Sequence, residues 1–269
     1  MPGSALIEIR MNDISTDTAG PGLQAFRLDG RVAVITGGAA GIGLATARLM
    51  AQAGARIAIL DRNEDAGASA VAQLPGAFFV PLDASSETSI EGAFAAVARE
   101  AGRIDILANN AGMSIRKSSA EISLAEWNQV MALNVTGSFL CARAAAARMP
   151  AQGGSIVNTA SIMGLSGGGP YPNPSYHASK GAVVNLTRSL AMEWASRGIR
   201  VNAVAPTWTE TGFIGNLSGA ALAAAQAATP LGRIAQAHEV ASAILFLASP
   251  ASAMVTGHVL AVDGGFLAQ

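Results

Sequence analysis

The sequence contains little of what marks a secreted, membrane-bound or nucleic-acid-binding protein. It has 269 residues and a single cysteine, Cys141, which excludes an intrachain disulfide framework and a cysteine-based zinc cluster. This cysteine usage fits a reducing compartment, so a cytoplasmic location is expected. Charged residues make up only 13% of the chain and the formal net charge is −1, so no overall field favours nucleic acid or anionic lipid as a partner.

Long apolar runs are also missing. No stretch approaches the roughly 20 consecutive apolar residues that a membrane span needs. Residues 1–26 lack the form of a signal peptide because their apolar run is short and Glu8 interrupts it, and they predict a polar extension ahead of one domain over 27–269. His238 and His258 lack partners at metal-ligand spacing, so no metal site is expected.

Hydrophobic residues are abundant, at 51% of the chain, and they fall into short runs. Seven such runs alternate with alanine-rich segments of helical length. Continuous hydrophobicity over a few residues is typical of parallel strands that are covered on both faces. The alternation predicts an α/β fold, a doubly wound parallel sheet in a single domain. The expected strands are 31–36, 55–60, 77–82, 104–109, 154–160, 199–205 and 258–262.

A glycine-rich loop, "VITGGAAGIGLATA", follows the first expected strand and opens a helix. Gly37, Gly41 and Gly43 form a G-x-x-x-G-x-G pattern. Glycine permits a tight turn and close backbone approach, and a helix N-terminus favours a pyrophosphate. By itself the pattern fits a plain strand-to-helix turn almost equally well, but its position after the first strand favours a dinucleotide.

Two acids follow the next strands. Asp61 lies 18 residues after Gly43, where a carboxylate can accept hydrogen bonds from an adenosine ribose and repel a 2′-phosphate. Asp61 therefore favours NAD over NADP, although the adjacent Arg62 could face a phosphate and a helix-capping or turn role is the alternative. Asp83, after the third strand, could bond the adenine amino group or cap the next helix.

Seven motifs occur in an order that resembles the short-chain dehydrogenase/reductase family over residues 27–269. They are "TGGAAGIG" (36–43), "NNAG" (109–112), Asn134 in "MALNVTG", Ser161 in "NTASIMG", "YHASK" (176–180), "NAVAPTWTET" (202–211) and "VDGGF" (262–266). The resemblance implies a seven-stranded Rossmann-type sheet, a nicotinamide cofactor and reversible oxidation of an alcohol. The cofactor contacts expected with it are Gly37, Gly41, Ile42, Gly43, Asp61, Asp83, Ala84, Asn110, Ala111, Gly112, Tyr176, Lys180, Pro206, Thr209 and Thr211.

The resemblance also implies a catalytic tetrad of Asn134, Ser161, Tyr176 and Lys180. In the family the serine holds the substrate oxygen and the asparagine holds a water that links the lysine to solvent. Tyr176 and Lys180 are one helical turn apart, on one face. A free tyrosine has a pKa near 10, and a nearby cation favours its phenolate. We expect Lys180, the charge of the oxidised nicotinamide and partial burial to lower the pKa of Tyr176, so that it can act as a general base.

The sequence departs from the family after the sixth expected strand, where Pro206 is followed by Thr207 instead of glycine. A β-branched residue does not adopt glycine's unusual dihedrals without strain, so the turn is expected to differ. Residues 208–233 stand where the family carries a substrate lid. Trp208 and Phe213 are expected either to line the pocket or to pack the lid down, and Tyr171 either to form a pocket wall or to face solvent.

Few fixed charges are expected near the pocket. Arg116 and Lys117, in the loop after "NNAG", are the exceptions, and they are expected on a solvated surface rather than in the pocket. This favours a neutral substrate, and the overall pattern is similar to NAD-dependent bacterial polyol and sugar-alcohol dehydrogenases of the family. The alternatives are a 3-ketoacyl reductase, which Ala40 and Asp61 disfavour, a hydroxysteroid dehydrogenase, and a non-catalytic NAD-binding sensor, which an intact tetrad disfavours. Many family members are homotetramers that pair the helices expected here at 123–149, which carries Cys141, and 175–197.

Overall fold

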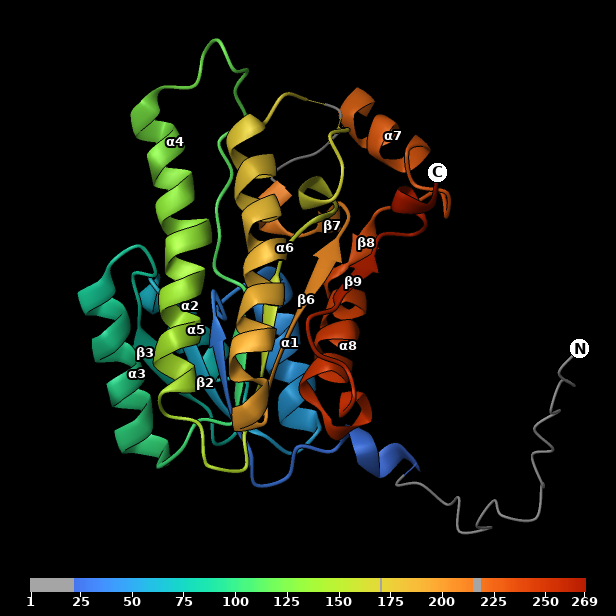
Figure 1. The fold of residues 1–269 in the computed structure, drawn as a ribbon. Coiled ribbons are helices and arrows are strands. Elements are labelled where there is room, and N and C mark those ends of the chain that lie inside the picture. The colour runs from blue at the N-terminus through green and yellow to red at the C-terminus, as the bar shows by residue number, and fades with distance from the viewer. Residues whose placement is uncertain (1–21, 170, 215–218) are drawn as a thin grey trace, which may run out of the picture.

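A computed structural model describes residues 22–169, 171–214 and 219–269 (Figure 1). Most of the predicted N-terminal extension and residues 215–218 of the predicted lid lie outside the described residues. Residues Gly22–Phe26 form a short 3₁₀ helix. The boundary between extension and domain at residue 26 stays a prediction.

Seven parallel strands form the central sheet, in the spatial order β3-β2-β1-β4-β5-β6-β9. This confirms the predicted doubly wound α/β fold, and each strand lies within one of the seven predicted runs or ends one residue beyond it. All five residues of β1 are buried, as expected for a strand covered on both faces. The strands are β1 Val32–Thr36, β2 Arg56–Asp61, β3 Phe78–Pro81, β4 Ile106–Asn109, β5 Gly154–Thr159, β6 Ile199–Pro206 and β9 Val259–Val262.

Helices cover both faces of the sheet (Figure 1). One apolar core lies between the sheet and a layer that includes Phe94, Cys141 and Leu190, and the other lies against a layer that includes Met50 and Ile244. Cys141 is fully buried, and burial raises the pKa of its thiol to about 12. The first layer holds α3 Glu87–Ala101, α4 Leu124–Met131, α5 Ser138–Ala146 and α6 Pro174–Trp194, and the second holds α1 Gly41–Gln52, α2 Glu64–Val71 and α8 Ala237–Ala248.

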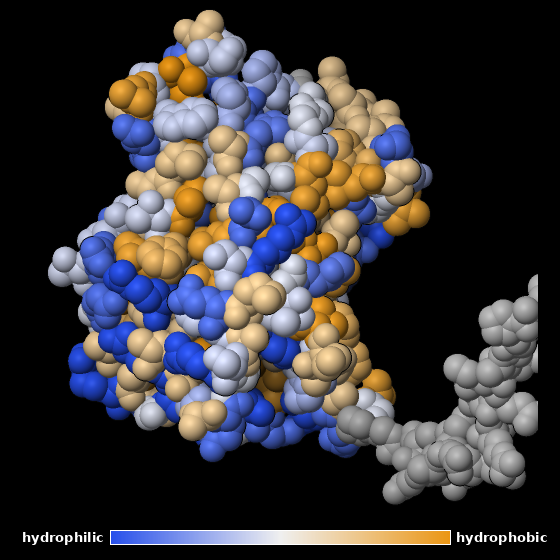
Figure 2. Space-filling view, viewed as in Figure 1, coloured by the Kyte–Doolittle hydropathy of each residue, from blue (hydrophilic) through white to orange (hydrophobic). Residues whose placement is uncertain are grey.

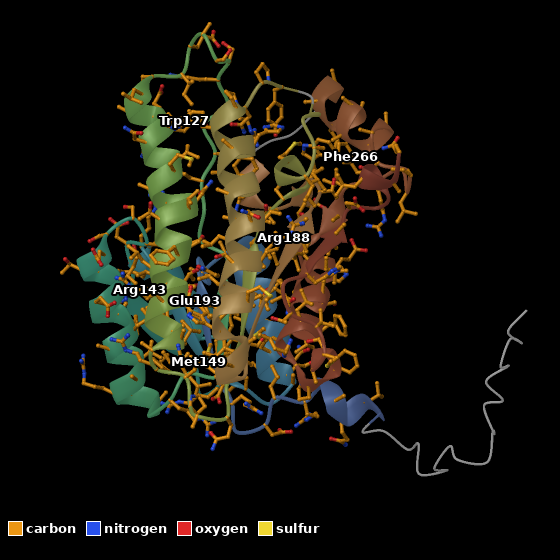
Figure 3. All side chains as sticks on the ribbon, in the orientation of Figure 1. Trp127, Arg143, Met149, Arg188, Glu193 and Phe266 are labelled. Carbon is orange, nitrogen blue, oxygen red and sulfur yellow. The ribbon has the colours of Figure 1, made fainter. Side chains whose placement is uncertain are left out.

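Local chemistry sets where α4 and α6 begin. Ser123 caps α4 through a capping box, in which its hydroxyl accepts from the backbone N–H of Glu126 and the Glu126 carboxylate accepts in return from the Ser123 backbone. Pro174 stands in the first turn of α6, where its missing N–H and fixed φ cost nothing. Figure 3 shows Arg143 on α5 pointing toward α3, where its guanidinium bonds Glu87 at 2.6 Å.

The helix expected over 123–149 is present, but it is not a regular α-helix throughout. A π-helical turn, Ala132–Gly137, separates α4 from α5. A side chain at Gly137 would overlap the carbonyl oxygen of Ala84, so the glycine allows the turn to pack directly on the loop after β3. Such turns insert one extra residue into a helix and are frequent at functional sites.

The C-terminal part of the chain carries the small elements near the predicted lid. These are a two-stranded pairing of β7 Thr209–Glu210 with β8 Ala235–Gln236 and the alanine-rich helix α7 Gly219–Ala227. Figure 2 shows a mainly apolar surface over α7, whereas hydrophilic residues gather over α3. Within the described ranges, no helix is both long enough and apolar enough to cross a membrane.

Candidate active site

A cavity of about 350 Å³ lies beyond the carboxyl ends of the central strands. This is the edge at which open α/β sheets bind ligands. Twelve of the residues predicted from the sequence line it: Gly37, Gly41, Ile42, Asn110, Ala111, Gly112, Ser161, Tyr176, Lys180, Pro206, Thr209 and Thr211. Five predicted residues do not line it: Gly43, Asp61, Asp83, Ala84 and Asn134.

The glycine loop between β1 and α1 has the form that the sequence predicts. Gly37 and Gly41 have φ angles of +62° and +52°, which side chains rarely adopt. A side chain at Gly43 would overlap the carbonyl oxygen of Gly37, so the loop closes tightly only with glycine there. No side chain caps the N-terminus of α1, because its N-cap is Ala40. The first N–H groups of α1 are therefore left for an anion, which fits the pyrophosphate of a dinucleotide.

The two acids stand at adjacent strand ends. Asp61 ends β2, and its carboxylate accepts from the N–H groups of Ala39 at 3.2 Å and of Asn63 at 3.1 Å. Asn63, not Asp61, caps α2. The exposed carboxylate of Asp83 accepts from the backbone and hydroxyl of Ser85, and these bonds hold its pKa below the usual value. Each carboxylate oxygen has two lone pairs, so both acids keep acceptor capacity for a ligand.

A chain of buried polar side chains crosses the sheet beneath the cavity. The Thr36 hydroxyl donates to Asn109 Oδ1 at 3.3 Å, and Asn109 Nδ2 donates to Asn158 Oδ1 at 3.2 Å. Asn158 Nδ2 donates to the hydroxyl of Thr187 on α6 at 3.0 Å. The register brings Thr36, Asn109 and Asn158 opposite one another on β1, β4 and β5. These bonds fix the ends of three strands and the helix that carries Tyr176.

Tyr176 lies in the first turn of α6 and lines the cavity together with Ser161. The Ser161 hydroxyl accepts from the N–H of Met163 at 3.2 Å, and its nearness to the phenol partly lowers the pKa of Tyr176. Ser161 comes directly before the 3₁₀ turn Ile162–Gly164, so its position follows from the end of β5. The structure thus brings together the two groups that the motifs predict at the reacting oxygen.

Lys180 lies one turn further along α6 and is 4% exposed. Its ammonium donates to the carbonyl oxygen of Thr159 at 2.6 Å and lies 5.6 Å from the centroid of the Tyr176 ring. A Cβ atom at Gly112 would lie 3.6 Å from Lys180 Nζ, an ordinary contact distance, so the "NNAG" segment packs directly beside the lysine. Lysine and tyrosine therefore share one helix face, as predicted from their spacing.

Burial acts on the Tyr176 pKa in the direction opposite to the predicted one. Burial raises the pKa of Tyr176 to about 12, and the hydrogen bond with Ser161 lowers it only in part. Burial also lowers the pKa of Lys180 to about 8. Both shifts have one cause, because a low dielectric disfavours the charged form of each group. The expectation that partial burial helps to form the phenolate was wrong. Nearby positive charges must lower the pKa of Tyr176 instead.

Asn134 lies in the π-helical turn and is fully buried. Its Oδ1 accepts from the N–H of Met113 at 2.8 Å, and its Nδ2 donates to the Met113 carbonyl and to the hydroxyl of Ser179 at 3.0 Å. These bonds tie the turn to the loop after β4 and to α6. A side chain at Gly112 would lie 3.2 Å from Asn134 Oδ1, so Asn134 stands directly behind the cavity wall.

Thr207 fits the turn after β6 without strain. No residue other than glycine has a positive φ within the described ranges, so this turn does not use a left-handed conformation at Thr207. The Thr207 N–H donates to the Val262 carbonyl at 3.1 Å, and Thr209 Oγ1 donates to the Thr207 carbonyl at 2.9 Å. Thr211 faces the glycine loop, since a side chain at Gly41 would lie 3.3 Å from it.

Aromatic side chains form much of the substrate end of the cavity. Trp208 and Phe213 both line it, and so does Tyr171. Trp208 is buried and packs edge-on against Phe266, labelled in Figure 3, with ring centroids 5.5 Å apart. Phe213 packs on Tyr176 with centroids 6.1 Å apart. Both alternatives for Trp208 therefore hold, because it lines the pocket and packs down the lid segment.

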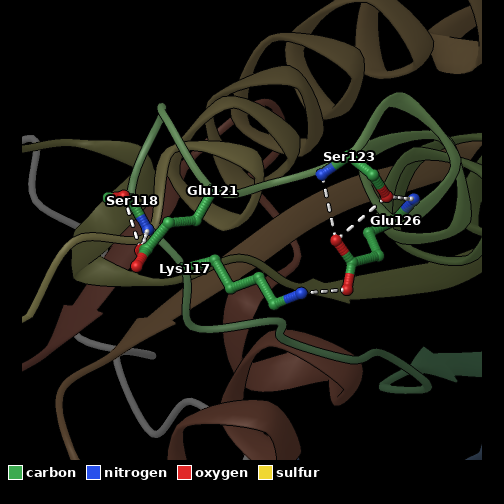
Figure 4. Close-up of polar contacts among 5 residues, drawn as sticks. All are labelled: Lys117, Ser118, Glu121, Ser123 and Glu126. Carbon is green, nitrogen blue, oxygen red and sulfur yellow. Dashed lines mark hydrogen bonds and ion pairs between the residues drawn. The ribbon is translucent and has the colours of Figure 1, made fainter.

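Arg116 and Lys117 are both exposed, as the sequence predicts, but Arg116 also belongs to the cavity wall. Arg116 is exposed but lines the cavity, and its guanidinium lies 4.7 Å from the centroid of the Tyr171 ring. Lys117 pairs with Glu126 of the α4 capping box (Figure 4). In the same loop Glu121 accepts from Ser118. The loop after β4 is thereby tied to the start of α4.

Sequence reasoning missed the polar pair of Ser114 and Asn173, both in the cavity wall. Asn173 Nδ2 donates to the Ser114 hydroxyl at 2.7 Å. These two residues are 59 positions apart, so no local pattern predicts their contact. Within the described ranges, no group of three His, Cys, Asp or Glu side chains could hold a metal ion.

A family model described as enoyl-(acyl carrier protein) reductase matches residues 37–267. The cis-4-hydroxycyclohexanecarboxylate dehydrogenase of Sinomonas cyclohexanicum is 44% identical over 243 residues, or 88% of this chain and 97% of that one. The galactitol 2-dehydrogenase (L-tagatose-forming) of Cereibacter sphaeroides is 44% identical over 246 residues, or 90% and 96%. The crystal structure of a short-chain type dehydrogenase/reductase from Mycobacterium marinum superposes with a TM-score of 0.88 at 35% identity, over 92% of this chain and 99% of that one.

Proposed function

Since the chain belongs to the short-chain dehydrogenase/reductase family, we propose that it transfers a hydride between NAD and a secondary alcohol of a polyol or sugar-like molecule. The chain is an oxidoreductase acting on CH–OH groups with a nicotinamide cofactor. The choice of NAD and of this substrate class is our proposal. Its main support is one observation: Ser161, Tyr176 and Lys180 meet at the wall of a single cavity that the glycine loop also lines.

In this proposal Tyr176 takes the proton of the substrate hydroxyl, and Ser161 holds the same oxygen by a hydrogen bond. When bound, the nicotinamide supplies the hydride acceptor for oxidation and the donor for reduction. A pKa of about 12 makes the Tyr176 phenol a poor base at neutral pH, so protonated Lys180 at 5.6 Å from its ring must favour the phenolate. Proton transfer by a positioned side chain of this kind accelerates a reaction by roughly 10²–10⁴.

Tightly placed glycines and one acid support the choice of cofactor. The uncapped N-terminus of α1 fits the pyrophosphate, and Thr211 and Pro206 line the cavity beside the glycine loop. Asp61, at the end of β2, would accept from the ribose hydroxyls and repel a 2′-phosphate. Asp83 and Ala84 would border the adenine from the end of β3.

A second candidate substrate is a hydroxy acid, and Arg116 is the observation that favours it. Its guanidinium lines the cavity over Tyr171, where it could attract a carboxylate at the far end of a substrate. The relative from Sinomonas cyclohexanicum is named for such an acid. Polyols and hydroxy acids would thus both react at Tyr176. They differ at the far end of the molecule, where a polyol carries hydroxyl groups and a hydroxy acid carries a carboxylate.

Absorbance of the reduced nicotinamide tests the proposal. The purified protein is assayed with NAD and with NADP on galactitol, threitol, cyclohexanol and cis-4-hydroxycyclohexanecarboxylate. Turnover with NAD on the polyols, lost in Tyr176→Phe, is the expected result. Turnover with NADP alone would overturn the role given to Asp61. Binding of NAD with no turnover on any of the four alcohols would instead favour a non-catalytic NAD-binding sensor.

We include a homotetramer and a cytoplasmic location in the proposal. The outer surfaces of α4 and α6 are the faces that the family pairs, and they expose two large apolar side chains, Leu124 at 74% and Met192 at 80%. Light scattering at micromolar concentration tests the assembly. A monomer would leave both side chains in water, and substituting either with serine would then not change the molar mass.

A further inference from the structure

The side chain of Asn173 is one of very few buried polar groups in the described residues with an unpartnered atom. Asn173 is 5% exposed and lines the cavity. Its Nδ2 donates to Ser114, but its Oδ1 is buried and has no hydrogen-bond partner. Buried polar atoms are nearly always hydrogen-bonded, and leaving one unpaired costs stability. A ligand in the cavity is the natural source of the missing donor.

Asn173 stands at a position where an asparagine oxygen would ordinarily be used to cap a helix. Asn173 is the N-cap of α6, a position that asparagine favours because its Oδ1 can accept from the first N–H groups of the helix. Asn173 makes no such capping bond. Its side chain is instead held by Ser114, from the loop after β4. The amide is thus turned away from its ordinary local role.

Several contacts hold Asn173 in place beside the reacting groups. The Asn173 carbonyl accepts from the N–H of His177 at 3.1 Å and contacts His177 Nδ1 at 2.8 Å. Asn173 precedes Tyr176 by three residues, and both residues line the same cavity. On the other side, the loop that carries Ser114 is anchored by the ion pair of Lys117 with Glu126 (Figure 4). The Asn173 side chain is therefore held in the wall of the cavity that Tyr176 also lines.

We infer that Asn173 Oδ1 accepts a hydrogen bond from a second hydroxyl of the substrate, on a carbon next to the one that reacts. Asn173 is then a specificity-determining residue that selects vicinal diols and polyols. The inference rests on the proposed dehydrogenase function and names its substrate class. An ionised carboxylate has no proton to donate, so Asn173 favours the polyol over the hydroxy acid that Arg116 could accept.

The test compares two substrates that differ by one hydroxyl, trans-cyclohexane-1,2-diol and cyclohexanol, in the full-length protein with NAD. The measured quantity is the ratio of their kcat/KM values. In the wild type the diol is expected to be preferred by about tenfold or more, because the mono-alcohol leaves the buried oxygen unpaired. Asn173→Leu removes both polar atoms at similar volume and should lower this ratio about tenfold. Asn173→Asp keeps an acceptor and should retain most of the preference.

Ser175→Ala is the matched control. Ser175 lies two residues away, is fully buried and also carries an unpartnered hydroxyl, but it does not line the cavity. This variant should keep the wild-type ratio. Thermal unfolding and NAD affinity, measured for every variant, show whether each one folds. An unchanged ratio in folded Asn173→Leu, or no preference in the wild type, would overturn the inference and leave the proposed function standing.

A binding measurement separates this inference from the proposed function. Trp208 lines the cavity, so titration of the diol into the NAD complex can be followed by tryptophan fluorescence. Saturable binding in the wild type that weakens at least fivefold in Asn173→Leu, without turnover, would support the diol site and refute the dehydrogenase proposal. Absence of saturable binding together with absence of turnover would overturn both.

Discussion

Replacing Lys180 with methionine should change how the stability of the protein depends on pH. Lys180 is 4% exposed, and burial lowers its pKa from 10.5 to about 8. A shift of this size corresponds to about 3 kcal/mol of unfavourable free energy for holding the ammonium form in the folded state. The hydrogen bond to Thr159 favours the ammonium, so about 3 kcal/mol is an upper bound. Lys180→Met removes this penalty and keeps the length of the side chain.

The direction follows from proton binding in the two states. At pH 7 the lysine is protonated both folded and unfolded, and the full penalty lowers the stability of the wild type. Between pH 8 and 10 the folded protein has released the proton while the unfolded chain still holds it, so wild-type stability rises with pH. The difference in unfolding free energy, wild type minus Lys180→Met, should therefore increase by up to about 2.5 kcal/mol between pH 7 and pH 10.

Urea unfolding of nucleotide-free wild type and Lys180→Met, at equal protein concentration and at each pH from 7 to 10, measures this difference. Other titrating groups are common to both proteins and cancel. Tyr176 lies close to Lys180, but burial raises its pKa to about 12, so the folded protein keeps the phenol protonated from pH 7 to 10. Two stability curves that stay parallel over the whole range would refute the reasoning and show that the Thr159 carbonyl fully compensates the buried charge.

Three further changes test the rest of the site. Tyr176→Phe should lower kcat by about 10²–10⁴ with NAD affinity nearly unchanged, and near-normal turnover would remove Tyr176 from the chemistry. Gly43→Ala should abolish tight NAD binding because its methyl group would overlap the Gly37 carbonyl, whereas Gly92→Ala, in open space on α3, should fold and bind normally. Asp61→Ser should raise the affinity for NADP relative to NAD at least about tenfold, as measured by calorimetry, because a like charge no longer opposes the 2′-phosphate. An unchanged preference would assign the discrimination to another group.

The sheet could be predicted from sequence because each parallel strand is buried on both faces and forms one continuous apolar run. β1 and β2 differ from the predicted runs by only one residue at either end. The proposed catalytic and glycine-loop residues could be selected from the sequence for a similar reason. Their proposed chemistry depends on residues that are close together in the sequence, such as Tyr176 and Lys180. Such short spacings can be recognised as local sequence patterns.

What could not be predicted depends on contacts between distant segments. The π-helical turn requires Gly137 to pack against the Ala84 carbonyl, and no helical periodicity records that contact. The raised pKa of Tyr176 comes from burial by other elements, which the "YHASK" motif does not contain. The place of Arg116 in the cavity wall depends on its contact with the ring of Tyr171, which is far away in the sequence.

The polar chain that runs from Thr36 through Asn109 and Asn158 to Thr187 has a consequence for local unfolding. The Thr36 hydroxyl also accepts from the N–H groups of Asn110 and Ala111, at 3.0 and 3.1 Å. These amides can exchange their hydrogens with solvent only when the Thr36 end of the chain opens, and each link is buried. The strand that precedes the glycine loop and the helix that bears the proposed base thereby belong to one cooperative unit. Local unfolding at either Thr36 or Thr187 should therefore expose both ends of the chain. The glycine loop and the Tyr176 region should then lose their structure together.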